Sequence, residues 1–128
     1  MIYNDEKVDI TKVDAIFEDN NVSIEITADD KNMFLCFNDK SFDPMTLNIN
    51  EKISIVDKIY WDVELVTKDT YYLFDISKDV VDLTRIDDNL FKVDVSITNP
   101  DIIFCPLDND NCFKKLIISV NFSFYYRR

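Results

Sequence analysis

The chain has 128 residues, of which 47% are hydrophobic and 30% are charged, and its formal net charge is −11. This composition is typical of one folded domain; it excludes a disordered chain, and no apolar run reaches the length of a membrane-spanning helix. The sequence contains no glycine and no histidine, which excludes glycine-built phosphate loops and removes the usual general base and the commonest metal ligand.

The balance of residue types predicts strands rather than helices. The chain has sixteen Ile, eleven Val and ten Phe but only two Ala, and 20 of its 25 acidic residues are Asp. β-branched and aromatic residues favour strands and Asp favours turns, whereas Ala and Glu favour helices. The same bias follows from an AT-rich coding sequence, which favours a bacterial or phage source and by itself accounts for the missing glycines.

In residues 1–49, apolar residues at alternate positions predict several short strands. Alternation runs through Val13, Ala15 and Phe17, then through Val22, Ile24 and Ile26, and again through Met45, Leu47 and Ile49. Turns rich in Asp and Asn lie at residues 19–21 and 29–32. Residues 33–37 are apolar at consecutive positions, which predicts a central strand or one whose outer face is covered.

The middle of the chain predicts a hairpin between two well-patterned strands. Residues 58–67 alternate through Ile59, Trp61, Val63 and Leu65, and residues 71–76 alternate through Tyr72, Phe74 and Ile76. Residues 68–70 supply the turn between them. Residues 50–58 and 77–86 are ambiguous, because each segment fits a short capped helix as well as a strand.

The end of the chain carries the clearest pattern. Residues 90–98 alternate through Phe91, Val93, Val95 and Ile97, and the last segment alternates through Leu116, Ile118, Val120, Phe122, Phe124 and Tyr126. A helix would scatter the last six residues around its circumference, whereas an extended strand places them all on one face. We therefore predict a long antiparallel strand that buries this face.

Together these segments predict an all-β fold, an antiparallel β-sandwich of about eight to ten strands with at most one or two short helices, formed by residues 1–128 as a single domain. A small barrel is disfavoured because its bends and bulges usually need glycine. Asn and Asp tolerate left-handed backbone better than most residues, so they can close the turns. Since two-residue type I′ turns favour glycine, we expect longer loops.

Three cysteines, Cys36, Cys105 and Cys112, do not have the spacing of a zinc site or a redox motif. The first residues lack the basic and apolar regions of a secretory signal. We therefore expect a cytoplasmic protein with three reduced and mostly buried thiols. In an oxidising compartment, Cys105 and Cys112 could instead face each other across a hairpin and form a disulfide.

No cluster of residues predicts catalysis, and we expect neither a cofactor nor a bound metal. The run Asp108, Asn109, Asp110 and Asn111 is the richest in oxygen ligands, but it lacks the glycine and the glutamate that an EF-hand requires at set positions. A nucleophilic cysteine would have no histidine as its base. With 25 acidic residues in the chain, pairs of carboxylates arise by chance and do not indicate a glycosidase.

The acidic charge points to a basic partner. Residues 113–128 hold Lys114, Lys115, Arg127 and Arg128 and no acid, so the acidic excess lies in residues 1–112. An acidic surface repels nucleic acids and anionic membranes and attracts basic proteins. The four basic residues flank an aggregation-prone strand and, in our interpretation, keep it soluble.

We therefore expect a non-enzymatic, acidic protein-binding module of bacterial or phage origin. Its role would be that of an inhibitor or immunity-type protein that neutralises a basic toxin, nuclease or DNA-binding enzyme. The expected contact residues lie in two late acidic turns and at two outward-facing tyrosines: Asp87, Asp88, Asp108, Asp110, Tyr71 and Tyr125. A structural subunit of a phage or secretion assembly, forming homo-oligomers through an edge strand, is the first alternative. A metal- or carboxylate-dependent hydrolase is the second.

Overall fold

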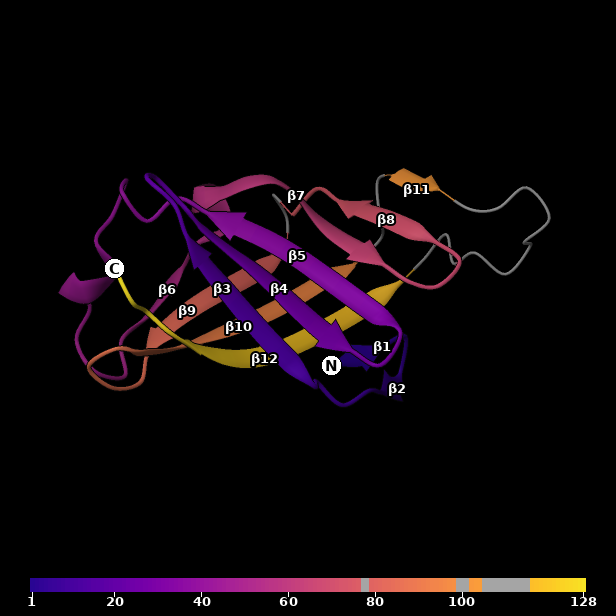
Figure 1. The fold of residues 1–128 in the computed structure, drawn as a ribbon, viewed down its shortest axis with the longest axis horizontal. Helices are drawn as coiled ribbons and strands as arrows, with labels where there is room; N and C mark the ends of the chain where they lie inside the picture. The colour runs from indigo at the N-terminus through magenta and orange to yellow at the C-terminus, as the bar shows by residue number, and fades with distance from the viewer. Residues whose placement is uncertain (77–78, 99–101, 105–115) are drawn as a thin grey trace.

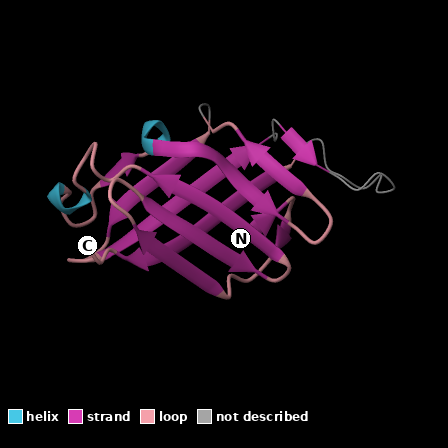
Figure 2. Cartoon of the chain, turned by 45° about the horizontal axis from the view of Figure 1, so that its top comes forward, coloured by secondary structure: helices cyan, strands magenta, loops and turns pink. Residues whose placement is uncertain are grey.

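A computed structural model describes residues 1–76, 79–98, 102–104 and 116–128, with the side chains of residues 60–62 and 102–104 outside the description. Two antiparallel sheets pack face to face, and their strands cross at a large angle (Figures 1 and 2). This arrangement confirms the predicted all-β sandwich. Neither 3₁₀ helix in the described part of the chain is long and apolar enough to cross a membrane.

Each sheet has six strands in the described ranges. Sheet A contains, in spatial order, β2 (Glu6–Lys7), β1 (Ile2–Tyr3), β12 (Ile117–Tyr125), β10 (Leu90–Thr98), β9 (Val80–Arg85) and β6 (Lys52–Ser54). Sheet B contains β11 (Ile102–Phe104), β8 (Tyr71–Phe74), β7 (Ile59–Val66), β5 (Lys31–Phe37), β4 (Val22–Ala28) and β3 (Lys12–Phe17). The described strands outnumber the eight to ten expected, because β1, β2, β6 and β11 have only two or three residues each.

The core lies between the two sheets and is built from the alternate positions that the sequence predicted. On β12 every second residue is buried, from Leu116 to Tyr126, and the residues between them are exposed. The ambiguous segment at 77–86 forms the strand β9 at Val80–Arg85, in which Val81 and Leu83 are fully buried. The predicted central strand is β5, which pairs with β4 on one side and β7 on the other.

The segment at 45–49 corrects one prediction. Instead of a strand, the chain forms the 3₁₀ helix η1 (Pro44–Thr46), because the Asp43 carboxylate accepts a hydrogen bond from the Met45 backbone N–H and Pro44 occupies the first turn. The ambiguous segment at 50–58 divides into β6 and a second 3₁₀ helix, η2 (Val56–Lys58). Figure 2 shows both short helices toward one end of the sandwich.

The turns confirm that Asn and Asp replace glycine. Longer loops connect β3 to β4 and β7 to β8, as expected, whereas residues 4–5 and 29–30 form shorter, two-residue turns. All four described residues with positive φ are of these types: Asn4, Asp5, Asp29 and Asn50. Tyr3 and Glu6 pair across a two-residue turn in which both central residues have positive φ, as a type I′ turn requires. Short polar side chains therefore accept the left-handed backbone that was expected to demand glycine.

Candidate functional site

The outer face of sheet B is hollowed. A depression of about 490 Å³ extends across β3, β4, β5 and β7. Its lining residues are Asp14, Ala15, Ile16, Ser23, Ile24, Glu25, Phe34, Leu35, Cys36 and Glu64. We call this depression the sheet B hollow. A cavity of this volume is large enough for a small ligand or for several side chains of a bound protein.

Strand register places three carboxylates in one row across the sheet B hollow. Asp14 lies opposite Glu25, Glu25 lies opposite Phe34, and Phe34 lies opposite Glu64. Like charges placed opposite each other on neighbouring strands destabilise a sheet, and this applies to Asp14 and Glu25, whereas Glu64 lies opposite Phe34. None of the described lining residues is basic. Lys12 lies outside the lining and forms an exposed ion pair with Asp14, with 2.9 Å between Nζ and Oδ2.

The next row across the hollow is uncharged. Ile16 lies opposite Ser23, and Ser23 lies opposite Cys36. Ile16 is 60% exposed, more than any other large hydrophobic residue that the structure describes. The hollow therefore combines an apolar floor and wall with a row of acidic groups.

The Cys36 thiol forms part of the hollow and is free and half-buried. Burial raises its pKa above the ordinary value, although a hydrogen bond from the Ser23 hydroxyl at 3.4 Å opposes this shift. The thiol is therefore protonated near neutral pH, and the chain contains no histidine to act as its base. In the described ranges, no group of three or more His, Cys, Asp or Glu side chains has the geometry to hold a metal ion. We expected reduced and mostly buried thiols; Cys36 is a free thiol but only half-buried, and Cys105 and Cys112 lie outside the described residues.

Three of the predicted contact residues lie together at one end of sheet A. Asp87 and Asp88 are exposed in the turn between β9 and β10, and Tyr125 on β12 lies opposite Leu90, just after that turn. The turn is ordered by Arg85, whose Nη2 donates to the Asp88 backbone carbonyl at 2.9 Å. Tyr125 is 57% exposed, and the Arg127 guanidinium lies 5.5 Å from the centre of its ring.

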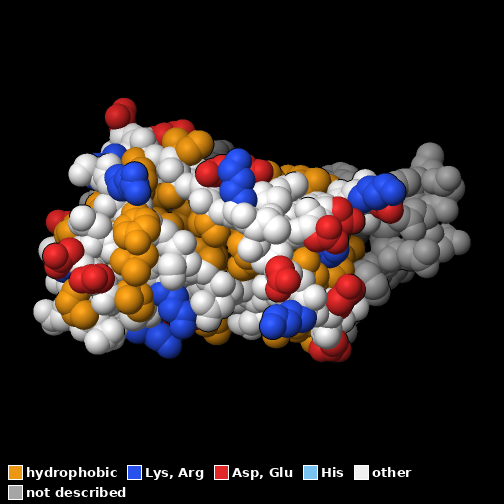
Figure 3. Space-filling view, turned by 60° about the horizontal axis from the view of Figure 1, so that its bottom comes forward, with side chains coloured by type: hydrophobic (Ala, Val, Ile, Leu, Met, Phe, Trp, Pro, Cys, Tyr) orange, Lys and Arg blue, Asp and Glu red, His pale blue; other side chains and the backbone are white. Residues whose placement is uncertain are grey.

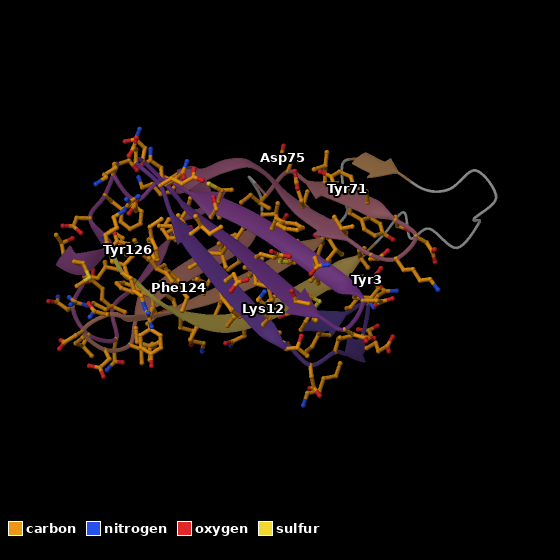
Figure 4. All side chains as sticks on the ribbon, viewed as in Figure 1. Tyr3, Lys12, Tyr71, Asp75, Phe124 and Tyr126 are labelled. Carbon is orange, nitrogen blue, oxygen red and sulfur yellow. The ribbon has the colours of Figure 1, made fainter. Side chains whose placement is uncertain are left out.

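The other predicted contact residues do not join this group. Tyr71 is half-buried on β8 of sheet B and lies toward the opposite end of the molecule from Tyr126 (Figure 4). Asp108 and Asp110 lie outside the described residues. The predicted set therefore does not form one surface among its described members.

Sequence reasoning missed the sheet B hollow, although two signals were present. Residues 33–37 were predicted to form a central strand or one whose outer face is covered, and Phe34 and Cys36 lie half-buried on the outer face. Asp14, Glu25 and Glu64 looked like ordinary polar positions of three separate strands. Only the register of four strands brings these carboxylates into line.

A buried polar cluster joins the two sheets at the end of β12. The Asp39 side chain is 0% exposed and accepts hydrogen bonds from the Tyr126 hydroxyl at 2.5 Å and from Arg128 Nη2 at 2.9 Å. Arg128 also donates to the Asn21 backbone carbonyl at 2.9 Å. The sequence interpretation of Arg128 as only a solubilising flank is therefore incomplete, because this side chain ties β12 to the loops of sheet B.

The cluster also explains the ionisation of its groups. Burial opposes ionisation of the Asp39 carboxyl, but the hydrogen bonds from Arg128 and Tyr126 outweigh burial and hold its pKa below the ordinary value. Burial and the neighbouring Asp39 carboxylate raise the pKa of Tyr126. Asp39 is therefore a charged, fully partnered structural group.

No protein-family model matches the chain, and no curated protein or solved structure is significantly similar to it.

Proposed function

We propose that this protein is a non-enzymatic binding module for a basic protein and that the partner contacts the sheet B hollow. The proposal keeps the inhibitor or immunity-type role, with a toxin, nuclease or DNA-binding enzyme of bacterial or phage origin as partner. It moves the expected contact surface away from the late turns, because Asp87 and Asp88 do not line the hollow.

The observation that carries the proposal is the row of carboxylates beside an apolar wall. Asp14 is paired with Lys12, but Glu25 and Glu64 form no ion pair among the described residues. Ile16 and Phe34 offer apolar contact beside them. Lys and Arg side chains suit such a surface, because their charged heads pair with carboxylates and their aliphatic stems pack on apolar groups. A bound basic partner would also relieve the repulsion between the aligned acids.

The charge of the whole chain supports the same partner. A net charge of −11 attracts basic proteins over long distances and raises association rates, typically by about 10-fold to 1000-fold at low salt. Carboxylates can also imitate the negative charge of a phosphate backbone, which a nuclease or a DNA-binding enzyme recognises.

The experiment compares the two outer faces after capture of a partner from the source cell. The double variant Glu25→Lys/Glu64→Lys reverses the charge of the hollow, and Asp82→Lys/Asp94→Lys makes the same charge change on the outer face of sheet A. We expect the wild-type affinity for the purified partner to fall about 100-fold in the first variant and less than about 3-fold in the second.

Salt provides the second measurement. Because the contact is between charged groups, we expect the dissociation constant of the wild-type complex to rise as ionic strength rises from about 0.05 to 0.2 M. An affinity that is indifferent to salt, an acidic partner, or a loss of binding confined to the sheet A variant would each refute the proposal.

A further inference from the structure

The strand β3 forms an open edge of sheet B. In the β3–β4 hairpin, the Glu18 N–H donates to the Asn21 carbonyl, so Glu18 and Asn21 form a hydrogen-bonded pair. Bonded and non-bonded pairs alternate along an antiparallel ladder. The backbone groups of Val13, Ala15 and Phe17 therefore point away from β4. Among the described residues, no backbone hydrogen bond reaches these groups.

A second depression lies on the other side of the same strand. It has a volume of about 280 Å³ and is lined by Val13, Ala15, Phe17, Ser123, Phe124, Tyr125 and Arg127. We call it the seam groove, because it lies between β3 of sheet B and β12 of sheet A. Val13, Ala15 and Phe17 point inward but remain half-buried, since the seam does not cover them completely. Figure 3 looks onto the lower side of the molecule as drawn in Figure 1 and shows apolar side chains uncovered between charged ones.

The two depressions sort the side chains of β3 by face. Asp14 and Ile16 line the sheet B hollow, whereas Val13 and Phe17 line the seam groove, and Ala15 contributes to both. A strand added beside β3 would continue this alternation, because successive side chains point to opposite faces. One set of its side chains would meet the acidic hollow, and the other set would meet the apolar seam groove.

We propose that the partner binds by adding one antiparallel strand to β3, and that this strand alternates Lys or Arg with apolar residues. This inference rests on the proposed function and specifies the segment that the partner presents. The basic side chains point to the row that contains Asp14 and Glu25, and the apolar ones pack against Val13, Ala15 and Phe17. Backbone hydrogen bonds along the edge supply affinity, and the alternation supplies specificity.

A basic partner is favoured over a second copy of this chain. Two copies would each bring a net charge of −11 to the contact, so their electrostatic interaction is repulsive. The edge itself carries Lys12, Asp14 and Glu18, and charged side chains on an edge strand oppose pairing between identical edges. Sedimentation of the purified protein tests this alternative. If the wild type is a stable dimer and Ala15→Pro is a monomer, a second copy occupies the edge and the proposal is overturned.

Synthetic peptides test the geometry directly. The probe is a capped eleven-residue peptide that alternates Lys with Val, and its control has the same composition in scrambled order. In an antiparallel addition, the residues bonded to Val13, Ala15 and Phe17 share their face, so they are the Val residues of the peptide. We expect N-methylation of the Val residues to weaken binding about 100-fold through the loss of edge hydrogen bonds, and N-methylation of the Lys residues to change it less than about 3-fold.

Three outcomes of the peptide experiment would overturn the proposal. They are equal binding of the alternating and scrambled peptides, equal effects of the two methylation patterns, and a loss confined to the Lys-methylated peptide. Protection of Cys36 from alkylation by the bound alternating peptide, assigned by peptide mapping, provides a supporting readout within the hollow.

The variant Ala15→Pro separates this inference from the proposed function. Proline removes an N–H that faces the open edge and leaves the β3–β4 hydrogen bonds in place, which edge strands tolerate. We expect the captured basic partner to bind this variant at least about 10-fold more weakly, with an unchanged circular dichroism spectrum. If the partner binds Ala15→Pro normally but fails to bind Glu25→Lys/Glu64→Lys, edge addition is wrong and the proposed function stands. If both variants bind normally, both proposals fall.

Discussion

The two outer faces of the sandwich differ, although the inner faces of both sheets follow the same alternation. On the outer face of sheet A, the middle of β12 presents the small exposed polar residues Ser119, Asn121 and Ser123, between exposed Ile117 and Tyr125 at its ends. On the outer face of sheet B, Glu25, Phe34 and Cys36 are half-buried within a hollow. Inward residues therefore specify the shared fold, and outward residues distinguish the two surfaces.

The charges on the two faces differ in arrangement as well. On sheet A, Lys92 lies 3.8 Å from Asp94, so acid and base are mixed along one strand. Sheet B mixes acid and base in the same way at Lys12 and Asp14, which lie 2.9 Å apart, but Glu25 and Glu64 in the hollow form no ion pair among the described residues. This contrast makes sheet A a built-in control for every substitution on sheet B, since both faces belong to one folded unit.

The largest expected effect separates the core from the outer faces. Phe91 is fully buried and packs against Phe124 and Tyr126, with ring centres 6.0 and 5.7 Å away. We expect Phe91→Ala to lower the free energy of unfolding by about 3–5 kcal/mol. Phe34→Ala in the hollow should lower it by about 1 kcal/mol, because Phe34 is only half-buried. Urea unfolding measures both, and equal losses would show that Phe34 belongs to the core rather than to a binding surface.

The next effect concerns the polar cluster that joins the sheets. Asp39→Asn removes the charge that Arg128 and Tyr126 share, and we expect it to lower the free energy of unfolding by about 2 kcal/mol. The control Tyr126→Phe removes one hydrogen bond and should lower it by about 1 kcal/mol. If Asp39→Asn and the wild type have the same midpoint of urea unfolding, the cluster does not hold the sheets together.

The same carboxyl predicts a pH dependence. The pKa of Asp39 is lowered in the folded protein, so its contribution to stability is present above the ordinary aspartate value of about 3.9 and is lost as pH falls through the folded value. We therefore expect the difference in stability between wild type and Asp39→Asn to shrink steadily below about pH 4. Thermal unfolding from pH 7 downward checks this, and a difference that stays constant would exclude Asp39 as the titrating group.

The sequence predicted the buried inner faces of the sheets better than the loops and the outer faces. The six alternating residues from Leu116 to Tyr126 were identified because period-two burial is a local pattern. The 3₁₀ helix at Pro44 was missed because the Asp43 cap competes with alternation over only three residues. The two-residue turn at Asn4 and Asp5 was missed because propensity undervalued left-handed Asn and Asp.

The hollow could not be predicted, because its residues come from four strands. Asp14, Glu25 and Glu64 are far apart in the sequence, and their alignment depends on strand order and register together. A shift of one residue in any pairing would turn these side chains to the other face. Local patterns therefore determine which residues face inward, whereas outward neighbours are known only after the topology is known.

The smallest expected effect makes the sharpest comparison between the faces. Each face holds a pair of acids directly opposite each other, Asp82 with Asp94 on sheet A and Asp14 with Glu25 on sheet B. Removing one charge relieves repulsion, so Asp82→Asn and Glu25→Gln should each raise the free energy of unfolding by about 0.3–0.5 kcal/mol. Only Glu25→Gln should also weaken binding of the captured basic partner, by about 5-fold, since only this pair lies in the hollow. A variant that gains folding stability but loses affinity for the partner is expected where like charges repel each other in the free protein and bind a cationic group in the complex. If both substitutions stabilise the fold and neither weakens the complex, the aligned acids serve no partner.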